Sequence, residues 1–362
     1  MSDTLRIIDL GAVPALRSQA VYHGVAAAMA PQDDPVLILV GTNEPYVCVG
    51  MHQNVEAEVD LAYCAAAGLP VLRRNVGGGA VYLDGNQLFF QFVVPVDRAP
   101  RRLEAMYSFF VAPVLDAYQS LGIQARLRPI NDIHVNDRKI GGTGAARIEE
   151  ATVFVGSFLL DFDTQTMARC LKVSSEKFRD KLKITLDDYL TTVRRELGHV
   201  PPREDLIARF LRATAERLML RPRPDSLRPD ELAQIHRWER RLGDPEWLHK
   251  PERQRFASAV KITGGVFLGE SARKAPGGLV RARVLVRDGI VIDAQLSGDF
   301  YCLPHDGLPA LELALRQLDL RHAPAAEIDA RLRALNLDLP GISAADIAST
   351  LLDALPRDGS AW

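Results

Sequence analysis

The first 250 residues alternate between short apolar runs and segments in which apolar residues recur at helical spacing. Residues 36–40 and 46–49 are two such runs, and glycine, asparagine and proline separate them, so we expect two short buried strands. Residues 88–94 are almost continuously apolar, which is typical of a central strand covered on both faces. Residues 153–162 predict a further core strand.

Helical spacing is clearest after Leu103, where apolar residues recur through Leu121. Pro113 lies inside this run and predicts a kink or a break in the helix, because proline has no N–H to donate. The other helical patterns cover about residues 187–197, 203–220 and 229–241. Together with the strands, they predict a large domain of mixed strands and helices.

A β-hairpin is predicted for residues 133–140. Asn136 and Asp137 lie between two short strand-like segments, and both residue types tolerate positive φ, so they favour a tight two-residue turn. The second strand of this hairpin carries Lys139.

Composition changes near residue 250, where Gly243, Pro245 and Pro251 interrupt the helical patterns. Glycine and proline commonly interrupt helices and strands, so we expect a domain boundary there. Residues 1–250 then form the first domain and residues 251–362 the second.

The second domain is predicted to be a small α+β domain. Apolar residues alternate with arginines over residues 280–287, which is typical of a strand with one solvated face. Asp288–Gly289 favours a hairpin turn, and residues 290–296 form the returning strand. Ser343 and Asp346 have the spacing of a capping box, so we expect them to begin the last helix.

Composition narrows the classes of function. The net charge of -2 gives no reason to expect a nucleic-acid partner, and no uncharged apolar run is long enough for a membrane span. The N-terminus lacks the apolar core of a secretory signal. Four widely spaced cysteines argue against a zinc site or a disulfide framework, so a reducing cytoplasm is expected.

The residues with the clearest chemistry form two groups. In the first, an arginine pair precedes three consecutive glycines, Gly77–Gly79, whose amides can converge on an anion because no Cβ intervenes. In the second, Asn131–Asp132 precedes Arg138–Gly142, which contains Lys139. The guanidinium groups of the two arginines and the ammonium group of Lys139 can bind anions, so we expect a pocket for a carboxylate and a phosphate. Neither the P-loop string nor the dinucleotide fingerprint occurs in the chain.

These two groups of residues resemble motifs of the lipoate–protein ligases, the ATP-dependent enzymes of the biotin/lipoate ligase superfamily. The R-R-x-x-G-G-G-A-V-[YF]-x-D loop of that family is matched by Arg73–Asp84, and its N-D and [RK]-K-[IV]-x-G motifs by Asn131–Asp132 and Arg138–Gly142. Residues 171–181, 261–265 and 298–300 also look like the family. The resemblance implies an α+β fold with a mixed central sheet packed with helices, followed by a small α+β accessory domain.

The resemblance also implies a two-step reaction. ATP with Mg²⁺ activates lipoic acid, or octanoate, to an acyl-adenylate, and the acyl group then passes to a lysine of a lipoyl-acceptor protein. That acceptor is a dehydrogenase E2 domain, the glycine-cleavage H protein or another lipoate-binding protein. Neither the acceptor nor the preference between the two acids follows from the residues, and oligomeric state stays open.

Lys139 is the expected catalytic residue, because its ammonium can offset the repulsion between the carboxylate and the α-phosphate. Arg74 suits a bidentate phosphate contact, and Asp132 is a candidate contact for Mg²⁺ or the nucleotide, although it could also cap the turn. By resemblance, Tyr82 faces the adenine. The substrate- and ATP-binding set is expected to comprise Arg74, Gly77, Gly78, Gly79, Ala80, Val81, Tyr82, Asn131, Asp132, Gly142 and Thr143. The lysine-rich run at 172–183 is either a loop that closes over the adenylate or a solvated helix face.

Some positions depart from the family pattern, including Val76 for serine, Leu83 for histidine and Gly144 for alanine. These departures keep a non-catalytic lipoyl-domain binder as an alternative. A second alternative is an octanoyl or lipoyl transferase with a cysteine acyl-enzyme, but residues 124–139 contain no cysteine. Biotin–protein ligase is disfavoured, because its basic glycine-arginine loop is replaced by residues 73–80.

Overall fold

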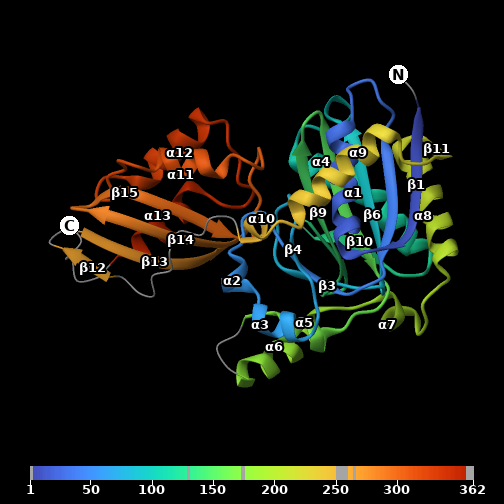
Figure 1. Ribbon diagram of the computed structural model, residues 1–362, viewed down its shortest axis with the longest axis horizontal. Helices are drawn as coiled ribbons and strands as arrows, with labels where there is room; N and C mark the ends of the chain where they lie inside the picture. The colour runs from blue at the N-terminus through green and yellow to red at the C-terminus, as the bar shows by residue number, and fades with distance from the viewer. Residues whose placement is uncertain (1–2, 129–130, 173–175, 250–259, 264–265, 356–362) are drawn as a thin grey trace. The chain divides into compact units, whose positions relative to one another are not determined.

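The computed structural model describes residues 3–128, 131–172, 176–249, 260–263 and 266–355 (Figure 1). The chain divides into two compact units. The first unit comprises Met1–Cys48, Glu56–Arg74 and Val81–Leu248. The second unit comprises Val49–Val55, Asn75–Ala80 and His249–Trp362, so two short segments from early in the sequence belong to it.

The first unit is built on an eight-stranded sheet with the order β11-β1-β2-β6-β10-β9-β8-β7. Its strands are β1 (Thr4–Val13), β2 (Val36–Thr42), β6 (Gln87–Pro95), β7 (Ala125–Arg128), β8 (Asp132–Val135), β9 (Arg138–Ile148), β10 (Ala151–Leu159) and β11 (Arg221–Pro224). β1 pairs in parallel with both β2 and β11, whereas the other neighbours are antiparallel. The sheet is therefore mixed, as predicted.

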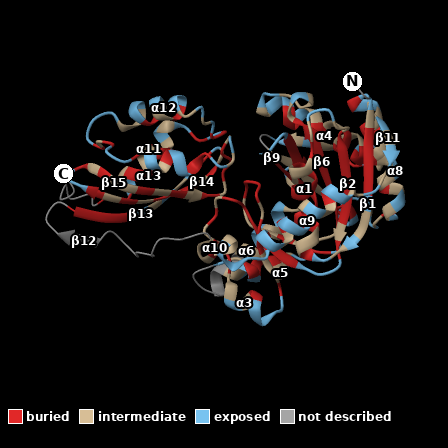
Figure 2. Ribbon diagram, turned by 45° about the horizontal axis from the view of Figure 1, so that its top comes forward, coloured by how far each residue is buried: buried red, intermediate tan, exposed pale blue. Residues whose placement is uncertain are grey.

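Helices cover both faces of this sheet. On one face, α4 (Leu103–Ser120) and α8 (Arg203–Leu218) enclose an aromatic core that includes Phe90, Phe92 and Phe210. Gln91 points to the opposite face, where its amide donates to the carbonyl of Ser18 in α1 (Ala15–Ala28). α9 (Pro229–Leu242) packs on α1. In Figure 2, β2 and β6 are buried over most of their length, whereas β1 is buried over Leu5–Ile8.

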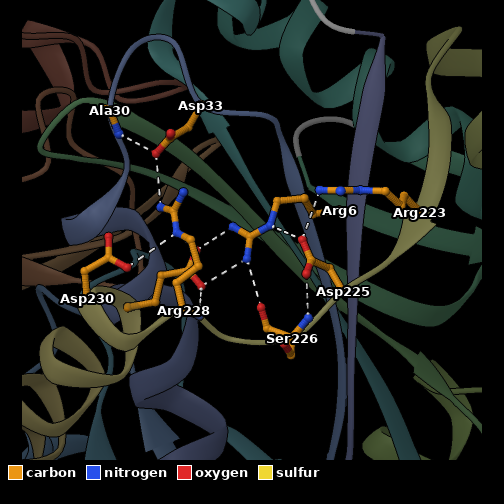
Figure 3. A network of polar contacts seen from close by, with 9 residues as sticks. Arg6, Ala30, Asp33, Arg223, Asp225, Ser226, Arg228 and Asp230 are labelled. Atoms are coloured by element: carbon orange, nitrogen blue, oxygen red, sulfur yellow. Dashed lines mark hydrogen bonds and ion pairs between the residues drawn. The ribbon is translucent and has the colours of Figure 1, made fainter.

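A network of charged side chains joins β1 to the first turn of α9 and to the segment before it (Figure 3). The Arg6 guanidinium donates to both carboxylate oxygens of Glu231, at 2.6 and 3.2 Å, and to Asp225 at 2.7 Å. Arg228 links the same network to Asp33 at 3.1 Å. Arg6 is 4% exposed and Glu231 is fully buried, so each charge is stabilised by the other in place of water.

A small second sheet, with the order β4-β3-β5, flanks the glycine-rich segment. Its strands are β3 (Tyr46–Val49), β4 (Val71–Arg73) and β5 (Val81–Leu83). The remaining helices of this part of the chain are α2 (Val55–Glu58), α3 (Leu61–Ala66), η1 (Val96–Arg98), α5 (Thr164–Cys170), α6 (Glu176–Tyr189), α7 (Val193–Leu197) and α10 (Pro245–His249).

The second unit contains a four-stranded antiparallel sheet in sequence order, β12 to β15. Its elements are β12 (Val260–Thr263), β13 (Val266–Ala275), β14 (Gly278–Arg287), β15 (Ile290–Gly298), α11 (Leu308–Ala314), α12 (Pro324–Ala334) and α13 (Ala344–Asp353). The alternation predicted for residues 280–287 is present, since Val280, Val284 and Val286 are buried in the core of this unit.

Turn and cap chemistry predicted several local features correctly. Asn136 has a φ of 53° between β8 and β9, and Asp288 and Gly289 have φ of 47° and 77° between β14 and β15. Ser343 and Asp346 form the predicted capping box at the start of α13.

Two helix predictions need correction. The single helix expected at 187–197 is two helices, because α6 ends at Tyr189, Leu190 forms a β-bridge with Lys139, and Thr192 caps α7. α4 continues through Pro113 without a break. The apolar residues before and after Pro113 enter one core, and this packing outweighs the one hydrogen bond that proline cannot make.

Candidate functional site

The hairpin of β8 and β9, which we call the lysine hairpin, brings Lys139 onto the same face as Asp132. The two-residue turn pairs Val135 with Arg138 and His134 with Lys139. Because side chains alternate along a strand, Lys139 then lies on the face that carries His134 and Asp132. The Lys139 Nζ is 2.7 Å from Asp132 Oδ1, and the two side chains are 28% and 22% exposed.

Gly142 makes room for the lysine side chain. A register shift between Ile133 and His134 pairs Asp132 with Gly142, so Gly142 joins the face of Lys139. A Cβ at this position would lie 3.1 Å from Lys139 Nζ and 3.2 Å from its Cε. Glycine therefore allows the ammonium to lie directly over the backbone beside Asp132.

Asn131 and Thr143 hold the open end of the hairpin together. The Thr143 amide and hydroxyl both donate to the Asn131 carbonyl at 2.9 Å, and the Asn131 side-chain amide donates to the Thr143 carbonyl at 3.1 Å. These contacts fix the backbone around Asp132. A direct ligand contact for either residue stays a prediction.

The two arginines before the glycines have different environments. Arg73 is 2% exposed and donates to the Leu248 carbonyl through Nε at 2.9 Å and Nη2 at 2.7 Å, while the Trp247 indole donates back to the Arg73 carbonyl. Arg74 is only partly buried and donates to the Cys48 carbonyl at 3.0 Å. We expected the guanidinium groups of both arginines to bind a ligand. This expectation is wrong for Arg73, whose guanidinium has a structural role.

The glycine loop, Asn75–Ala80, folds as part of the second unit. The Met51 amide donates to the Val76 carbonyl at 3.0 Å, and the Gly298 amide donates to the His52 carbonyl at 2.9 Å. The His52 and Phe300 rings stack with centroids 5.7 Å apart. The loop thus lies in a layer made from three distant stretches of sequence, and Gly78 has a φ of 96°, which favours glycine.

Gly77 has no room for a side chain. A Cβ there would lie 2.8 Å from Cδ1 of Tyr301 and 3.0 Å from the Phe300 carbonyl oxygen, whereas a Cβ at Gly79 would approach Asp299 no closer than 3.7 Å. Gly77→Ala should therefore displace the loop and destabilise the protein by about 1–3 kcal/mol in urea unfolding, the usual cost of overpacking. Gly79→Ala is the matched control, because its Cβ has room, and it should change the free energy of unfolding by less than about 0.5 kcal/mol. Equal effects from both substitutions would contradict this packing argument.

Tyr82 is 6% exposed, and its ring meets the edge of Phe162 with centroids 6.0 Å apart. It pairs with Val47, and its neighbour Val81 pairs with Cys48, so the strand after the glycine loop is anchored by β3. Burial, followed by the nearby Asp84 carboxylate, raises the pKa of Tyr82. The predicted contacts of Ala80, Val81 and Tyr82 with the nucleotide stay predictions.

The lysine-rich run is largely helical, since α6 starts at Glu176. Arg179 donates to the carbonyls of Ala168 and Arg169 at the end of α5, at 3.1 and 2.9 Å, and Lys183 pairs with Asp187 at 2.7 Å. Residues 173–175, and the side chains of Lys177, Phe178 and Lys181, lie outside the described part. So do residues 264–265 of the C-terminal motif.

All four cysteines are free and no more than 3% exposed. Burial raises the pKa of Cys48 and raises that of Cys302 to about 12. A hydrogen bond to Cys64 raises the pKa of Cys170, and the same contact lowers the pKa of Cys64. Inaccessible thiols are poor nucleophiles, which weighs against a cysteine acyl-enzyme.

Within the described residues, no group of three or more histidine, cysteine, aspartate or glutamate side chains is arranged to hold a metal ion. Asp132 is engaged by Lys139 and Tyr189. No helix in the described part of the chain has the length and apolar character needed to cross a membrane.

The sequence analysis assigns no site role to two further residues at this hairpin. His134 is 1% exposed and lies on the face of Lys139. Tyr189 comes from the end of α6, and its hydroxyl donates to Asp132 Oδ2 at 3.2 Å. No sequence motif marks Tyr189, because its contact depends on how α6 ends.

Comparisons with known proteins agree on one family. Residues 15–215 match the lipoyl protein ligase A/B catalytic domain. Lipoate–protein ligase 1 of Staphylococcus aureus is 35% identical over 141 residues, which cover 38% of this chain and 42% of that protein. Lipoate-protein ligase LplJ of Bacillus subtilis is 24% identical over 268 residues, covering 73% and 76%. A solved structure of a bipartite lipoate protein ligase and its E2 lipoyl domain from Thermoplasma acidophilum has a TM-score of 0.63 and 25% identity, covering 71% of this chain and 100% of that chain.

Proposed function

This chain belongs to the lipoyl protein ligase A/B catalytic domain family, and we propose that it is an ATP-dependent, AMP-forming lipoate–protein ligase. The observation that carries the proposal is the lysine hairpin. There the Lys139 ammonium is held 2.7 Å from Asp132 over the backbone of Gly142, where a Cβ would crowd the lysine side chain.

In the proposed first step, a lipoate carboxylate oxygen attacks the α-phosphorus of ATP, which forms the acyl-adenylate and releases pyrophosphate. Both reactants are anions, so their approach costs Coulomb energy that a fixed ammonium can offset. Lys139 supplies that ammonium. Arg74, which is only partly buried, is the proposed phosphate partner, and the Gly77–Gly79 amides are proposed to bind polar groups of the substrates.

In the proposed second step, the ε-amine of an acceptor lysine attacks the acyl carbonyl and AMP departs. The Lys139 ammonium is then placed to stabilise the charge on AMP. The Thermoplasma acidophilum system pairs its ligase with an E2 lipoyl domain, and we propose an acceptor of this class here. An E2 domain, a glycine-cleavage H protein and another lipoate-binding protein remain the candidates.

Mg²⁺ is proposed to enter as part of the nucleotide substrate, because it prefers phosphate oxygens together with one or two carboxylates. Asp132 is the proposed carboxylate. Each of its oxygens accepts one contact in this structure and keeps a second lone pair, so Asp132 can contact the ion while Lys139 and Tyr189 stay in place. We place the protein in the cytoplasm, where its four free thiols stay reduced.

The direct test is intact-mass analysis of candidate acceptor domains after incubation with the protein, ATP–Mg²⁺ and either lipoate or octanoate. A mass increase equal to one lipoyl or octanoyl group that requires ATP is expected. Without an acceptor, the same mixture should accumulate acyl-AMP. Binding of a lipoyl domain without acyl-AMP formation would instead support the non-catalytic alternative. Loss of activity on replacing the cysteines, with the fold retained, would support the transferase alternative.

A further inference from the structure

The end of α6 is attached to the lysine hairpin through its backbone and through one side chain. The Thr191 amide donates to the Lys139 carbonyl at 2.9 Å, and Leu190 forms a parallel β-bridge with Lys139. One residue earlier, the Tyr189 hydroxyl donates to Asp132 Oδ2 at 3.2 Å. Residues 189–191 therefore contact both the backbone of Lys139 and the side chain with which its ammonium pairs.

The Asp132 carboxylate is held at both oxygens. Oδ1 receives the Lys139 ammonium at 2.7 Å, and Oδ2 receives the Tyr189 hydroxyl. A carboxylate bound at one oxygen can turn about its side-chain torsion, whereas one bound at both oxygens cannot turn without losing a hydrogen bond. The Tyr189 hydroxyl thus fixes the direction in which Asp132 presents Oδ1.

Tyr189 is 38% exposed, and one aromatic contact supports its ring. Its ring meets the His134 imidazole edge to face, with centroids 5.7 Å apart and an interplanar angle of 74°. Burial, and then the Asp132 carboxylate, raise the pKa of Tyr189 to about 12, so the hydroxyl is a donor at neutral pH. The His134 Nε2 lies 3.9 Å from Asp132 Oδ2, beyond hydrogen-bond distance, so it does not replace the tyrosine.

We propose that Tyr189 is a positioning residue for acyl-adenylate formation, because its hydroxyl orients Asp132 and Asp132 in turn places the Lys139 ammonium. The inference rests on the proposed function of Lys139. The inference also links the end of α6 to the lysine hairpin, because Tyr189 can reach Asp132 only if α6 ends at this residue. The hydroxyl itself touches no reacting atom in this account.

Tyr189→Phe tests the inference, because it removes only the hydroxyl and keeps the ring against His134. The kcat for acyl-AMP formation should fall about tenfold, the effect of losing one hydrogen bond to a charged group that is partly exposed, with the KM values for ATP and lipoate unchanged. Tyr107→Phe, in the core of α4, is the matched control and should leave kcat unchanged. An unchanged kcat in Tyr189→Phe, or a rise in KM alone, would overturn the proposal.

A double-mutant cycle separates a positioning role from a general structural one. If Tyr189 acts through Asp132, Tyr189→Phe should have no further effect in the Asp132→Asn background. If the two substitutions multiply their effects, the route through Asp132 is wrong.

A second readout requires no turnover and therefore distinguishes failure of this inference from failure of the proposed function. Competitive acylation of surface amines, read by peptide mass spectrometry, reports how tightly the Lys139 amine is held. Labelling of Lys139 should be about threefold faster in Tyr189→Phe than in the wild type, because the ion pair is less well fixed. Equal rates would overturn the role of Tyr189 even if the wild type makes acyl-AMP. Faster labelling in a protein that makes no acyl-AMP would show that Tyr189 holds the Lys139 ammonium in place but would refute the ligase assignment.

Discussion

Replacing Lys139 with alanine should lower the rate of acyl-adenylate formation by about 100- to 1000-fold, the usual effect of deleting one preorganised electrostatic donor. The reason is that no other cationic side chain is paired with Asp132 over Gly142 in the described hairpin. The rate is measured as lipoate-dependent release of pyrophosphate from ATP–Mg²⁺. The fold should survive, because the Lys139–Asp132 ion pair is partly exposed and contributes at most about 1 kcal/mol.

Arg126→Ala is the control for Lys139→Ala. Arg126 lies across from His134 in the neighbouring strand β7, and its guanidinium reaches Asp137 at 3.7 Å near the turn. It is thus a cation from the same sheet edge that pairs away from Asp132, so its loss should change the rate by less than about twofold, as expected for an exposed ion pair. If Lys139→Ala were to form acyl-AMP at the wild-type rate, Lys139 would not have the proposed role.

Replacing Glu231 with alanine should destabilise the first unit by about 3–5 kcal/mol, because Arg6 would remain buried with part of its charge uncompensated. Glu231 receives two hydrogen bonds from the Arg6 guanidinium and one from the Arg228 amide. The ion pair itself need not add net stability, since burying two charges is costly; the loss comes from removing one partner. Urea unfolding followed by the fluorescence of Trp238 in α9 measures the change.

Glu239→Ala is a matched control in the same helix. Glu239 also receives two hydrogen bonds from one arginine, Arg17, but these side chains are 21% and 27% exposed, compared with 0% and 5% for Glu231 and Arg6. Water can solvate the remaining arginine, so the loss should be about 1 kcal/mol. Similar losses from the two variants would show that burial does not determine the effect.

The sequence predicts features that depend on neighbouring residues. The turn at Asn136–Asp137 follows from residues that tolerate positive φ, and its two-residue length sets Lys139 opposite His134. The aromatic core strand β6 follows from its continuous apolar run. The mixed sheet covered by helices, which the family resemblance implied, is likewise present.

Other features depend on contacts between distant segments, which a linear pattern does not encode. Arg73 and Arg74 are identical and adjacent, yet only the position of the Leu248 carbonyl makes Arg73 a buried structural residue. The helix expected at 187–197 is interrupted because residue 190 forms a bridge with a strand fifty-one positions earlier, at Lys139. Tyr189 reaches Asp132 only as a result of that interruption.

The glycine loop has a consequence for dividing this protein into fragments. It is encoded before residue 81, but its packing partners Phe300 and Tyr301 are encoded more than two hundred codons later. A gene cut after codon 248 would therefore separate the loop from its support. The two polypeptides should need co-expression to rebuild that layer. Inactivity of one fragment tested by itself would therefore not show that its residues are dispensable or inactive in the full chain.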